Sequence, residues 1–402
     1  MATASRVLLG LGGCVDYELK LTAGVLSSLA FEYGVVAGEL TSPAVVANER
    51  DLVVSILGYV ARGAGGEHFV ASAPALSAFA SRFPHRETLG GTSVRAGILM
   101  SRLGVPSTLH LVTVNDTFRR LLPADTEHIN SGVEDTFYPH LIVQYDRGLR
   151  IRSGDIDIEA PSPNRLIYVN DPANGDMLLT EDLGARLSRA EVFLISGFNA
   201  MRDKAELDAR LASLTQHMRR LPPGAVTYFE DAAYHEPAFS RRVREALLGQ
   251  IDVYGLNEDE LQSYLGRQVD LLDPDEVAAA LTAAQALIPV PTLVLHTKYW
   301  AVALGAGGYA EALDTGTVMA ATRYCHGDDF TGEDVERLRR QPRRPESVAF
   351  VAALRSRMDS CLGQTVEGVP GFALDVENPT TVGLGDTFVG GFLAELALKG
   401  HG

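Results

Sequence analysis

The second half of the chain alternates short apolar runs with segments of helical periodicity, and this rhythm constrains the fold more than any other feature. Five runs after Pro172 have the apolar character of buried strands, with helical patterns between most of them: EVFLISG, AVTYFED, DVYGLN, TLVLHT and WAVAL. Such a rhythm predicts a parallel sheet with helices on both faces. Ligands bind such sheets beyond the carboxyl ends of the strands, so functional residues are expected where these runs end.

The first half of the chain has a different texture. Residues 20–82 show helical spacing, whereas residues 133–170 contain alternating runs separated by turn residues, which indicates antiparallel strands. We therefore predict an α/β protein whose doubly wound, mostly parallel sheet is flanked by helices and formed by residues 1–16, 85–117 and 173–402. Residues 17–84 and 118–172 are predicted to form a smaller α/β lobe. Two lobes imply a cleft between them.

Charge and cysteine content narrow the choice of partners. The 402-residue chain has 35 Lys and Arg against 51 Asp and Glu, a net charge of −16. Its long-range field repels nucleic acid and anionic membranes, so a phosphate must be held locally by helix N-termini, metal ions or a few placed cations. Three separated cysteines form no CxxC pair, and no apolar stretch is long enough to span a membrane. We expect a soluble, cytoplasmic protein without nucleic-acid or membrane partners; its oligomeric state is left open, and a monomer is compatible with the sequence.

The most specific motif, NPTTVGLGDTFVGGF, lies near the C-terminus. Gly383, Leu384 and Gly385 precede Asp386 at the start of a predicted helix. Glycines let a ligand approach the backbone, and the free N–H groups of a helix start attract anions. A carboxylate beside a bound anion is useful if it takes a proton from a hydroxyl that attacks a phosphoryl group. The alternative is that Asp386 merely caps its helix.

Three of the apolar runs end in polar residues that could serve the same cleft. Asn257 and Glu260, in GLNEDEL, suit a hydrated Mg²⁺ shared with ligand phosphates. The same spacing is that of a helix capping box, which needs no metal. Glu230 ends the run AVTYFE and is either a further metal ligand or an ordinary strand-end acid. His296 and Thr297 end TLVLHT, where a lone histidine can also be a simple loop residue.

Candidate sugar-binding residues come from the first half of the chain. Asp16 follows the first apolar run, and Gly90 and Gly91 open a predicted helix. An aspartate can accept hydrogen bonds from two adjacent hydroxyls, and a glycine pair admits a ligand against the backbone. The alternative is that these are turn glycines and a helix cap. Glu67, after RGAGG, is either a hydroxyl acceptor on the smaller lobe or solvated surface.

Taken together, the motifs resemble the ADP-dependent glucokinase/phosphofructokinase family, a branch of the ribokinase-like sugar kinases. The resemblance covers nearly the whole chain, and the motifs follow the family's order: GLGGCVD, RGAGGEHF, LGGTSVRAG, PSPNRLIYVND, FLISGFNAM, YFED, GLNEDEL, LHTKYWAV and NPTTVGLGDTF. It implies a glycolytic type of reaction, in which the β-phosphoryl group of Mg-ADP is transferred to a hexose hydroxyl and AMP is released.

The resemblance also implies a role for each candidate residue. Asp386 is the general base, and Gly383, Leu384 and Gly385 supply the N–H groups of an anion hole. The Mg²⁺ is assigned to Glu260, Glu230 and Asn257, and the nucleotide is assigned to His296, Thr297 and Asn257. The sugar is assigned to Asp16, Gly90, Gly91 and Glu67, with Glu67 near the position where glucose-using members carry a carboxylate.

One departure from the family pattern affects the sugar site. Thr92 and Ser93 follow the glycine pair where the family usually has an amide residue and a small residue, and Arg95 comes soon after. Glucose and fructose 6-phosphate both remain open as acceptors. Glu67 favours an unphosphorylated hexose, because a carboxylate repels a substrate phosphate. Cations that could instead bind such a phosphate are Arg95, Arg165, Arg202, Lys298 and Arg323.

Two alternative functions remain. One is an ATP-dependent, ribokinase-type kinase of another sugar or nucleoside. The other is a non-catalytic sugar or nucleotide sensor on the same fold. The presence of Asp386, Glu260 and the glycine loop argues against a sensor, which has no need of a base.

Overall fold

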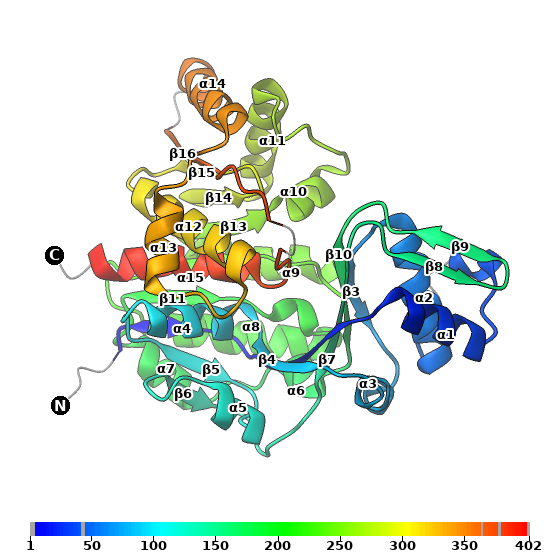
Figure 1. Ribbon diagram of the computed structural model, residues 1–402. Helices are drawn as coiled ribbons and strands as arrows, with labels where there is room; N and C mark the ends of the chain where they lie inside the picture. Colours follow the sequence, from blue (N-terminus) through cyan, green and yellow to red (C-terminus); the bar gives the residue numbers. More distant parts are fainter. Residues whose placement is uncertain (1–4, 42–44, 363–364, 377–378, 400–402) are drawn as a thin grey trace.

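The computed structural model describes residues 5–41, 45–362, 365–376 and 379–399, which form two sheets of different size (Figure 1). The larger sheet has nine strands in the order β16-β15-β14-β13-β12-β11-β1-β5-β6. They are β1 (Val7–Leu9), β5 (Thr108–Leu111), β6 (Glu127–Asn130), β11 (Val192–Ile195), β12 (Val226–Glu230), β13 (Val253–Asn257), β14 (Thr292–His296), β15 (Trp300–Gly305) and β16 (Val366–Pro370). All neighbouring pairs are parallel except β14–β15 and β15–β16.

Helices cover both faces of the nine-stranded sheet. One face carries α4 (Thr92–Arg102), α12 (Ala310–His326) and α15 (Leu384–Lys399). The other carries α7 (Glu181–Leu187), α8 (Lys204–Met218), α9 (Pro237–Leu247), α10 (Glu258–Leu265), α11 (Pro274–Leu287) and α14 (Pro345–Leu362). Successive strand residues alternate between the two cores: Leu194 packs on the first, Phe193 and Ile195 on the second. Burial on both faces explains why these strands read as continuous apolar runs.

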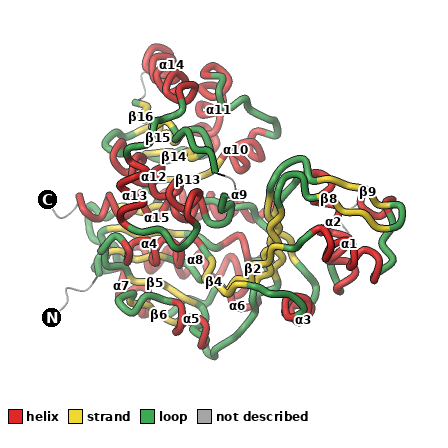
Figure 2. Tube along the Cα trace, in the orientation of Figure 1, coloured by secondary structure: helices red, strands yellow, loops and turns green. Residues whose placement is uncertain are grey.

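The smaller sheet has five strands in the order β3-β10-β7-β2-β4 and lies at the right of Figure 1. The strands are β2 (Cys14–Lys20), β3 (Gly66–Phe69), β4 (Arg86–Gly90), β7 (His140–Tyr145) and β10 (Asn164–Val169). One face packs under α1 (Ala23–Glu32), α2 (Glu49–Arg62) and α3 (Ala73–Ser81). A hairpin of β8 (Arg150–Ser153) and β9 (Ile156–Glu159) extends from this lobe (Figure 2).

The other face of the five-stranded sheet carries several polar side chains. Strand pairing places Asp16 beside Thr88 and His140, and Glu67 beside Ile167, with side chains opposite to those that enter the lobe core. We name this face, with Asp16, Glu18, Glu67, Thr88, His140, Gln144 and Arg165, the open face of the lobe. Arg95 of α4 contacts Asp16, and His235 contacts Glu67, so residues of the larger part lie against this face.

The predicted fold class, a doubly wound and mostly parallel sheet with a smaller α/β lobe, is confirmed. Strand membership differs from the predicted division in two places. β4 pairs with β2 in the five-stranded sheet, although residues 85–117 were assigned to the larger part. β6 pairs with β5 at the edge of the nine-stranded sheet, although residues 118–172 were assigned to the lobe. Both strands are short and half polar, so their local pattern carries no information about which distant strand they join.

The described residues also bear on a predicted boundary, on the C-terminal motif and on membrane insertion. Residue 16 falls inside β2, so the predicted boundary there cuts a strand. Asn378 of the C-terminal motif lies outside the described residues. Among the helices that the structure describes, none combines the length and apolar content that a membrane crossing requires.

Candidate active site

The C-terminal glycine motif forms a turn that leads directly into α15. Gly383 has φ of 68°, a left-handed conformation that favours glycine, and α15 begins at the next residue. The Gly383 carbonyl accepts hydrogen bonds from the backbone N–H and the hydroxyl of Thr387, at 3.0 and 2.7 Å. A Cβ atom at Gly383 would lie 2.9 Å from the Arg95 side chain and 3.2 Å from Nε of Arg323. The turn therefore requires glycine here and has two guanidinium groups beside it.

Asp386, in the first turn of α15, is held by a neighbouring helix. Its Oδ1 accepts a hydrogen bond of 2.8 Å from Oγ1 of Thr92, and its Oδ2 lies 3.6 Å from Nε of Arg95. Thr92 and Arg95 are one turn apart on α4, and the Asp386 side chain remains a quarter exposed. These partners show that Asp386 links α15 to α4. The departure from the family pattern at Thr92 thus falls directly on the predicted base.

Asp16 and the glycine pair come together at the junction of lobe and core. Asp16 is buried, and a side chain on Gly90 would collide with its carboxylate. Gly91 has φ of 92°, and a Cβ there would lie 3.1 Å from Cα of Gly13. Arg95 donates a hydrogen bond of 2.8 Å from Nη2 to Oδ2 of Asp16. Asp16 is therefore already ion-paired in this structure, a contact that sequence reasoning missed.

A partly buried histidine lies on the other side of Asp16. His140 Nδ1 is 3.9 Å from Oδ1 of Asp16, and its Nε2 is 3.3 Å from Oδ2 of Asp171. Burial favours the neutral imidazole, but Asp171 and Asp16 outweigh it and raise the pKa of His140. Cys14, Asp16 and His140 lie close enough together to share a metal ion. Because Asp16 is neutralised by Arg95, we assign no ion to this cluster.

The strand-end residues of β12, β13 and β14 form a second cluster. Glu230, Asn257 and His296 are the last residues of three neighbouring strands. Nε2 of His296 lies 2.8 Å from Oε1 of Glu230, and both side chains are buried. Burial opposes a charged imidazole, but Glu230 and, more weakly, Glu260 outweigh it and raise the pKa of His296. The predicted convergence of these strand ends is therefore observed.

Asn257 and Glu260 form the capping box that was the alternative interpretation of their spacing. Oδ1 of Asn257 accepts from the N–H groups of Asp259 and Glu260, at 2.7 and 3.1 Å, and the Glu260 carboxylate accepts from the backbone and amide nitrogens of Asn257, at 2.6 and 2.8 Å. Burial, Asp231 and Glu230 raise the pKa of Glu260 to about 8. A carboxylate oxygen has two lone pairs, so the capping box leaves acceptor capacity free. The buried Glu230 and Asp231 and the partly buried Glu260, together with His296, form an oxygen-rich group of acids, the anionic cluster, suited to a hard divalent cation.

His296 connects this anionic cluster to the glycine turn. A Cβ at Gly385 would lie 3.4 Å from Cε1 of His296, and the imidazole stacks on Phe388 of α15 with 4.7 Å between ring centroids. The turn beside Asp386 and the cluster around Glu260 thus adjoin the same side chain. Thr297 has a local role, because its hydroxyl donates to the carbonyl of Trp300, at 2.9 Å, and closes the turn between β14 and β15.

Glu67 is not solvated surface. Its Oε1 lies 2.7 Å from Nε2 of His235, which follows β12 in the larger part of the molecule. Burial raises its pKa, but His235, His140 and His68 outweigh this and leave the pKa of Glu67 lowered. Two residues further along β3, the guanidinium of Arg202 lies 3.6 Å from the ring centroid of Phe69. Glu67 therefore marks a contact between the lobe and the core.

The candidate cations are dispersed rather than gathered at one place. Arg95 and Arg323 lie beside the glycine turn, and Arg202 lies beside Phe69. The ammonium of Lys298 is 4.9 Å from the ring centroid of Tyr299. Arg165 is on β10, opposite Gln144, on the open face of the lobe.

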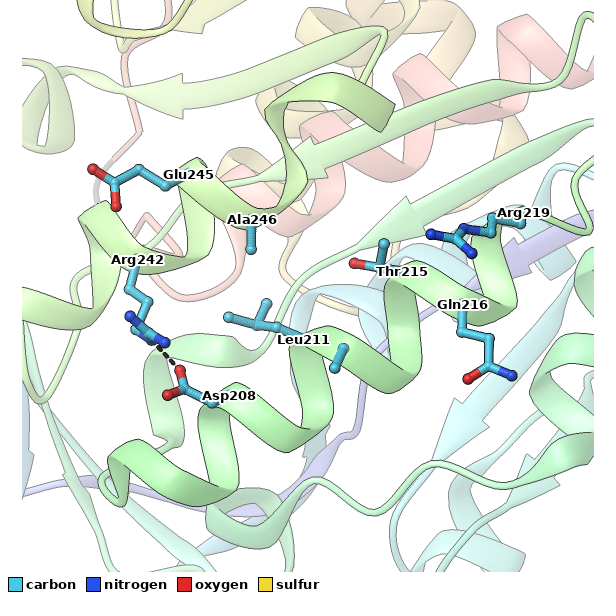
Figure 3. A pocket seen from close by; sticks show the side chains of 9 residues that line it. Asp208, Leu211, Thr215, Gln216, Arg219, Arg242, Glu245 and Ala246 are labelled. Atoms are coloured by element: carbon cyan, nitrogen blue, oxygen red, sulfur yellow. Dashed lines mark hydrogen bonds and ion pairs between the residues drawn. The ribbon is translucent and has the colours of Figure 1, made fainter.

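Elsewhere, a groove of about 650 Å³ lies between α8 and α9 (Figure 3). Its lining includes Asp208, Leu211, Arg219, Arg242 and Glu245, with an ion pair between Asp208 and Arg242. It shares no residue with the clusters described above.

Comparison with known proteins identifies the family of the chain and gives solved structures of similar fold. The family described as the ADP-specific phosphofructokinase/glucokinase conserved region matches residues 5–394. Among solved structures, a hypothetical ADP-dependent phosphofructokinase from Pyrococcus horikoshii OT3 is similar, with a TM-score of 0.76, 18% identity and 99% coverage of each chain. A phosphofructokinase from the same organism with AMP has a TM-score of 0.75, 18% identity and 99% coverage of each chain.

A third solved structure is an ADP-dependent kinase in complex with fructose-6-phosphate and ADPβS. It has a TM-score of 0.73 and 13% identity, and the match covers 98% of this chain and 95% of that one. A search of curated proteins found no match. At identities this low, the solved structures show a shared fold alone. The family is shown by the match to residues 5–394, which covers nearly the whole chain. The protein belongs to the ADP-specific phosphofructokinase/glucokinase family and is a sugar kinase of that family.

Proposed function

We propose that the protein transfers the β-phosphoryl group of ADP to a hexose hydroxyl, at the site between Asp386 and the His296–Glu230–Glu260 cluster. One observation carries this proposal: His296 of the anionic cluster lies beside Gly385 of the glycine turn, and the next residue of the chain is the acid Asp386. A kinase needs a proton acceptor on one side of the transferred group and a means of holding the nucleotide on the other.

Asp386 is proposed as the general base. The acceptor hydroxyl loses its proton to Asp386 while its oxygen bonds to the β-phosphorus. The bond from that phosphorus to the oxygen bridging it to the α-phosphate breaks, and AMP leaves. General-base catalysis contributes about 10²- to 10⁴-fold to such reactions. Thr92 and Arg95 orient the Asp386 carboxylate, because each contacts one of its oxygens.

The glycine turn is proposed to hold the transferred group. Backbone N–H groups of Gly383, Leu384 and Gly385, at the start of α15, are unpaired donors of the kind that stabilise developing negative charge. Exclusion of water by the lobe protects the nucleotide from hydrolysis. The contacts of Arg95 and His235 with the open face support a role for the lobe in covering the site.

Magnesium would be held by the carboxylates of Glu230 and Glu260, with Asn257 and His296 beside them. These carboxylates fit the ion, whereas Oδ1 of Asn257 already accepts two backbone hydrogen bonds, so Asn257 would act by holding Glu260 or through a metal-bound water. The ion, when bound, supplies positive charge that offsets the charge of the diphosphate. Thr297 is proposed to act only by shaping the turn that carries His296.

The sugar is proposed to lie on the open face of the lobe, against Asp16, Gly90 and Gly91 and near Glu67. Glu67 favours an unphosphorylated hexose such as glucose. Fructose 6-phosphate is a second candidate, because His235 and Arg202 lie at the same corner and could offset the charge of Glu67. Relatives of similar fold are named as phosphofructokinases, one of them in complex with fructose-6-phosphate, which also supports the second candidate.

The partners that this function requires are small molecules, a sugar and a nucleotide. A cytoplasmic location and the absence of nucleic-acid and membrane partners remain predictions from charge and cysteine content. The oligomeric state is not specified by the proposal.

A matrix of donors and acceptors tests the proposal. ADP, ATP, GDP and pyrophosphate are each combined with glucose, glucosamine, fructose 6-phosphate and ribose in the presence of Mg²⁺, and products are identified by mass. We expect AMP and a phosphorylated hexose with ADP. Faster turnover with ATP would favour the ribokinase-type alternative, and ADP binding without turnover on any acceptor would favour a sensor.

A further inference from the structure

Arg95 is a buried cation that faces acids from two different parts of the molecule. It belongs to α4, and its side chain is only 5% exposed. Its Nη2 lies 2.8 Å from Oδ2 of Asp16 and 3.6 Å from Oε1 of Glu18, both on β2 of the lobe sheet. Its Nε lies 3.6 Å from Oδ2 of Asp386 on α15. One side chain therefore contacts both the strand assigned to the sugar and the acid assigned to the proton.

The chemistry of this contact is specific to arginine. Nε and Nη2 are neighbouring nitrogens of one planar group, so the guanidinium fixes how far the Asp16 and Asp386 carboxylates lie from each other. A lysine has one nitrogen on a flexible stem and cannot hold both carboxylates in that way. A buried charge also carries a desolvation penalty, which the paired carboxylates offset, so losing this geometry leaves a charge without compensation.

Arg95 is also unsuited to the role that its residue type suggested. As one of five candidate cations, it could have bound a substrate phosphate. In the structure its Nε and Nη2 are directed to carboxylates, and its Cδ and Nη1 lie 2.9 Å from the Cβ position of Gly383. Its acidic partners within 4 Å are Asp16, Glu18 and Asp386.

We propose that Arg95 is a positioning residue that sets the spacing between the sugar-holding acid Asp16 and the base Asp386, so that the reacting hydroxyl lies within reach of the base. This inference rests on the proposed roles of those two acids. It goes beyond them in naming the residue that couples the lobe to the chemical step. The coupling acts through the two carboxylates that Arg95 contacts.

The test is the variant Arg95→Lys, which keeps the positive charge. We expect kcat to fall about tenfold to a hundredfold, since a misplacement of about 1 Å can cost that much. The KM for the sugar should rise severalfold, and the KM for ADP should stay within about twofold. Arg102→Lys is the matched control: Arg102 ends the same helix, is exposed, and lies over the Phe330 ring at 4.9 Å to its centroid. It should leave all three constants unchanged.

Two further measurements keep the inference falsifiable if Arg95→Lys is unstable. In the Asp16→Asn background, Arg95→Lys should raise the sugar KM much less than it does alone, because interacting residues are non-additive. In Arg95→Ala, added guanidinium ion should restore part of kcat, whereas ammonium should not. Full additivity together with no rescue would overturn the inference, as would an unchanged kcat in Arg95→Lys.

Asp386→Asn, assayed alongside, separates the two proposals. If Asp386→Asn stays active, the proposed catalytic base is wrong and the inference about Arg95 fails with it. If Asp386→Asn is inactive while Arg95→Lys retains full kcat and sugar KM, the inference alone is wrong. A loss of kcat in Arg95→Lys that is matched by a lower Tm and lost ADP binding would show a structural role and would also overturn it.

Discussion

The two sheets of the molecule carry their polar residues in different ways. In the nine-stranded sheet both faces are apolar, and the candidate nucleotide and metal residues Glu230, Asn257 and His296 are confined to the ends of adjacent strands. In the five-stranded sheet, polar residues such as Asp16 and Glu67 lie along one face, the open face, rather than only at strand ends. In the proposed function, the phosphoryl donor binds at the strand ends of one sheet and the acceptor binds at the open face of the other, with the start of α15 between them.

The largest expected effect on kcat comes from changing Asp386, at the start of α15. In Asp386→Asn the proton acceptor is lost while the hydrogen bond from Thr92 can remain, so kcat should fall at least about a hundredfold. ADP affinity, measured by calorimetry, should change little. Glu395→Gln, an acid further along the same helix that accepts from Thr315 at 3.1 Å, is the control and should keep full activity. More than about one hundredth of the activity in Asp386→Asn would disprove the assigned role.

The second effect concerns Glu260, beside the strand ends of the nine-stranded sheet, and its role in binding Mg²⁺. Glutamine also supports a capping box at the third helical position, so Glu260→Gln removes charge while preserving the helix start. The Mg²⁺ concentration for half-maximal activity should rise by about tenfold, by loss of one carboxylate ligand. Asp259→Asn, an exposed acid in the same turn, should leave the Mg²⁺ titration unchanged. If Glu260→Gln has the same Mg²⁺ titration as the unchanged protein, Glu260 acts only in the capping box of α10.

The third effect concerns the open face of the lobe and distinguishes the two candidate sugars. Glu67→Gln weakens the contact with His235, so the KM for an unphosphorylated hexose should rise about threefold to tenfold. With fructose 6-phosphate as the acceptor, the same change should lower KM, because it removes a negative charge near the substrate phosphate. Glu159→Gln, on the exposed β9 hairpin of the same lobe, should have no effect. A shift in the KM for ADP alone would contradict the assignment of Glu67 to the sugar side.

The smallest effect on catalysis is expected from a change on the face of the lobe sheet that packs under α1, α2 and α3. The hydroxyl groups of Ser55 and Tyr168 form a buried hydrogen bond of 2.9 Å beneath the helices. Tyr168→Phe should lower the free energy of unfolding by about 1–2 kcal/mol, measured by urea denaturation, with kcat unchanged. A large loss of kcat in a folded variant would mean that the two faces of the lobe sheet do not act separately.

The contrast between the sheets also explains which features could be predicted from sequence. Strand-end residues such as Glu230 and His296 follow recognisable apolar runs, so their convergence at one rim was predictable from the topology of parallel sheets. Asn257 and Glu260 could not be assigned, because a capping box and a magnesium pair use the same residues at the same spacing. The structure contains the capping box, and the Mg²⁺ titration of Glu260→Gln tests whether Glu260 also binds the ion.

The acceptor side was less predictable, because its contacts are non-local. Arg95 has the pattern of an ordinary helical cation, and only the packing of α4 between β2 and α15 brings it to Asp16 and Asp386. The contact of Glu67 with His235 likewise joins residues far apart in the chain. β4 and β6 pair across the predicted boundary between the two parts for the same reason, since pairing partners are not encoded in a short, half-polar strand.

The most direct test is a crystal structure of Asp386→Asn with ADP, Mg²⁺ and the acceptor sugar. We predict the β-phosphate against the N–H groups of Gly383, Leu384 and Gly385, the acceptor hydroxyl between it and residue 386, and the ion beside Glu230 and Glu260. A diphosphate bound away from the start of α15, or an ion bound far from those two acids, would contradict the account.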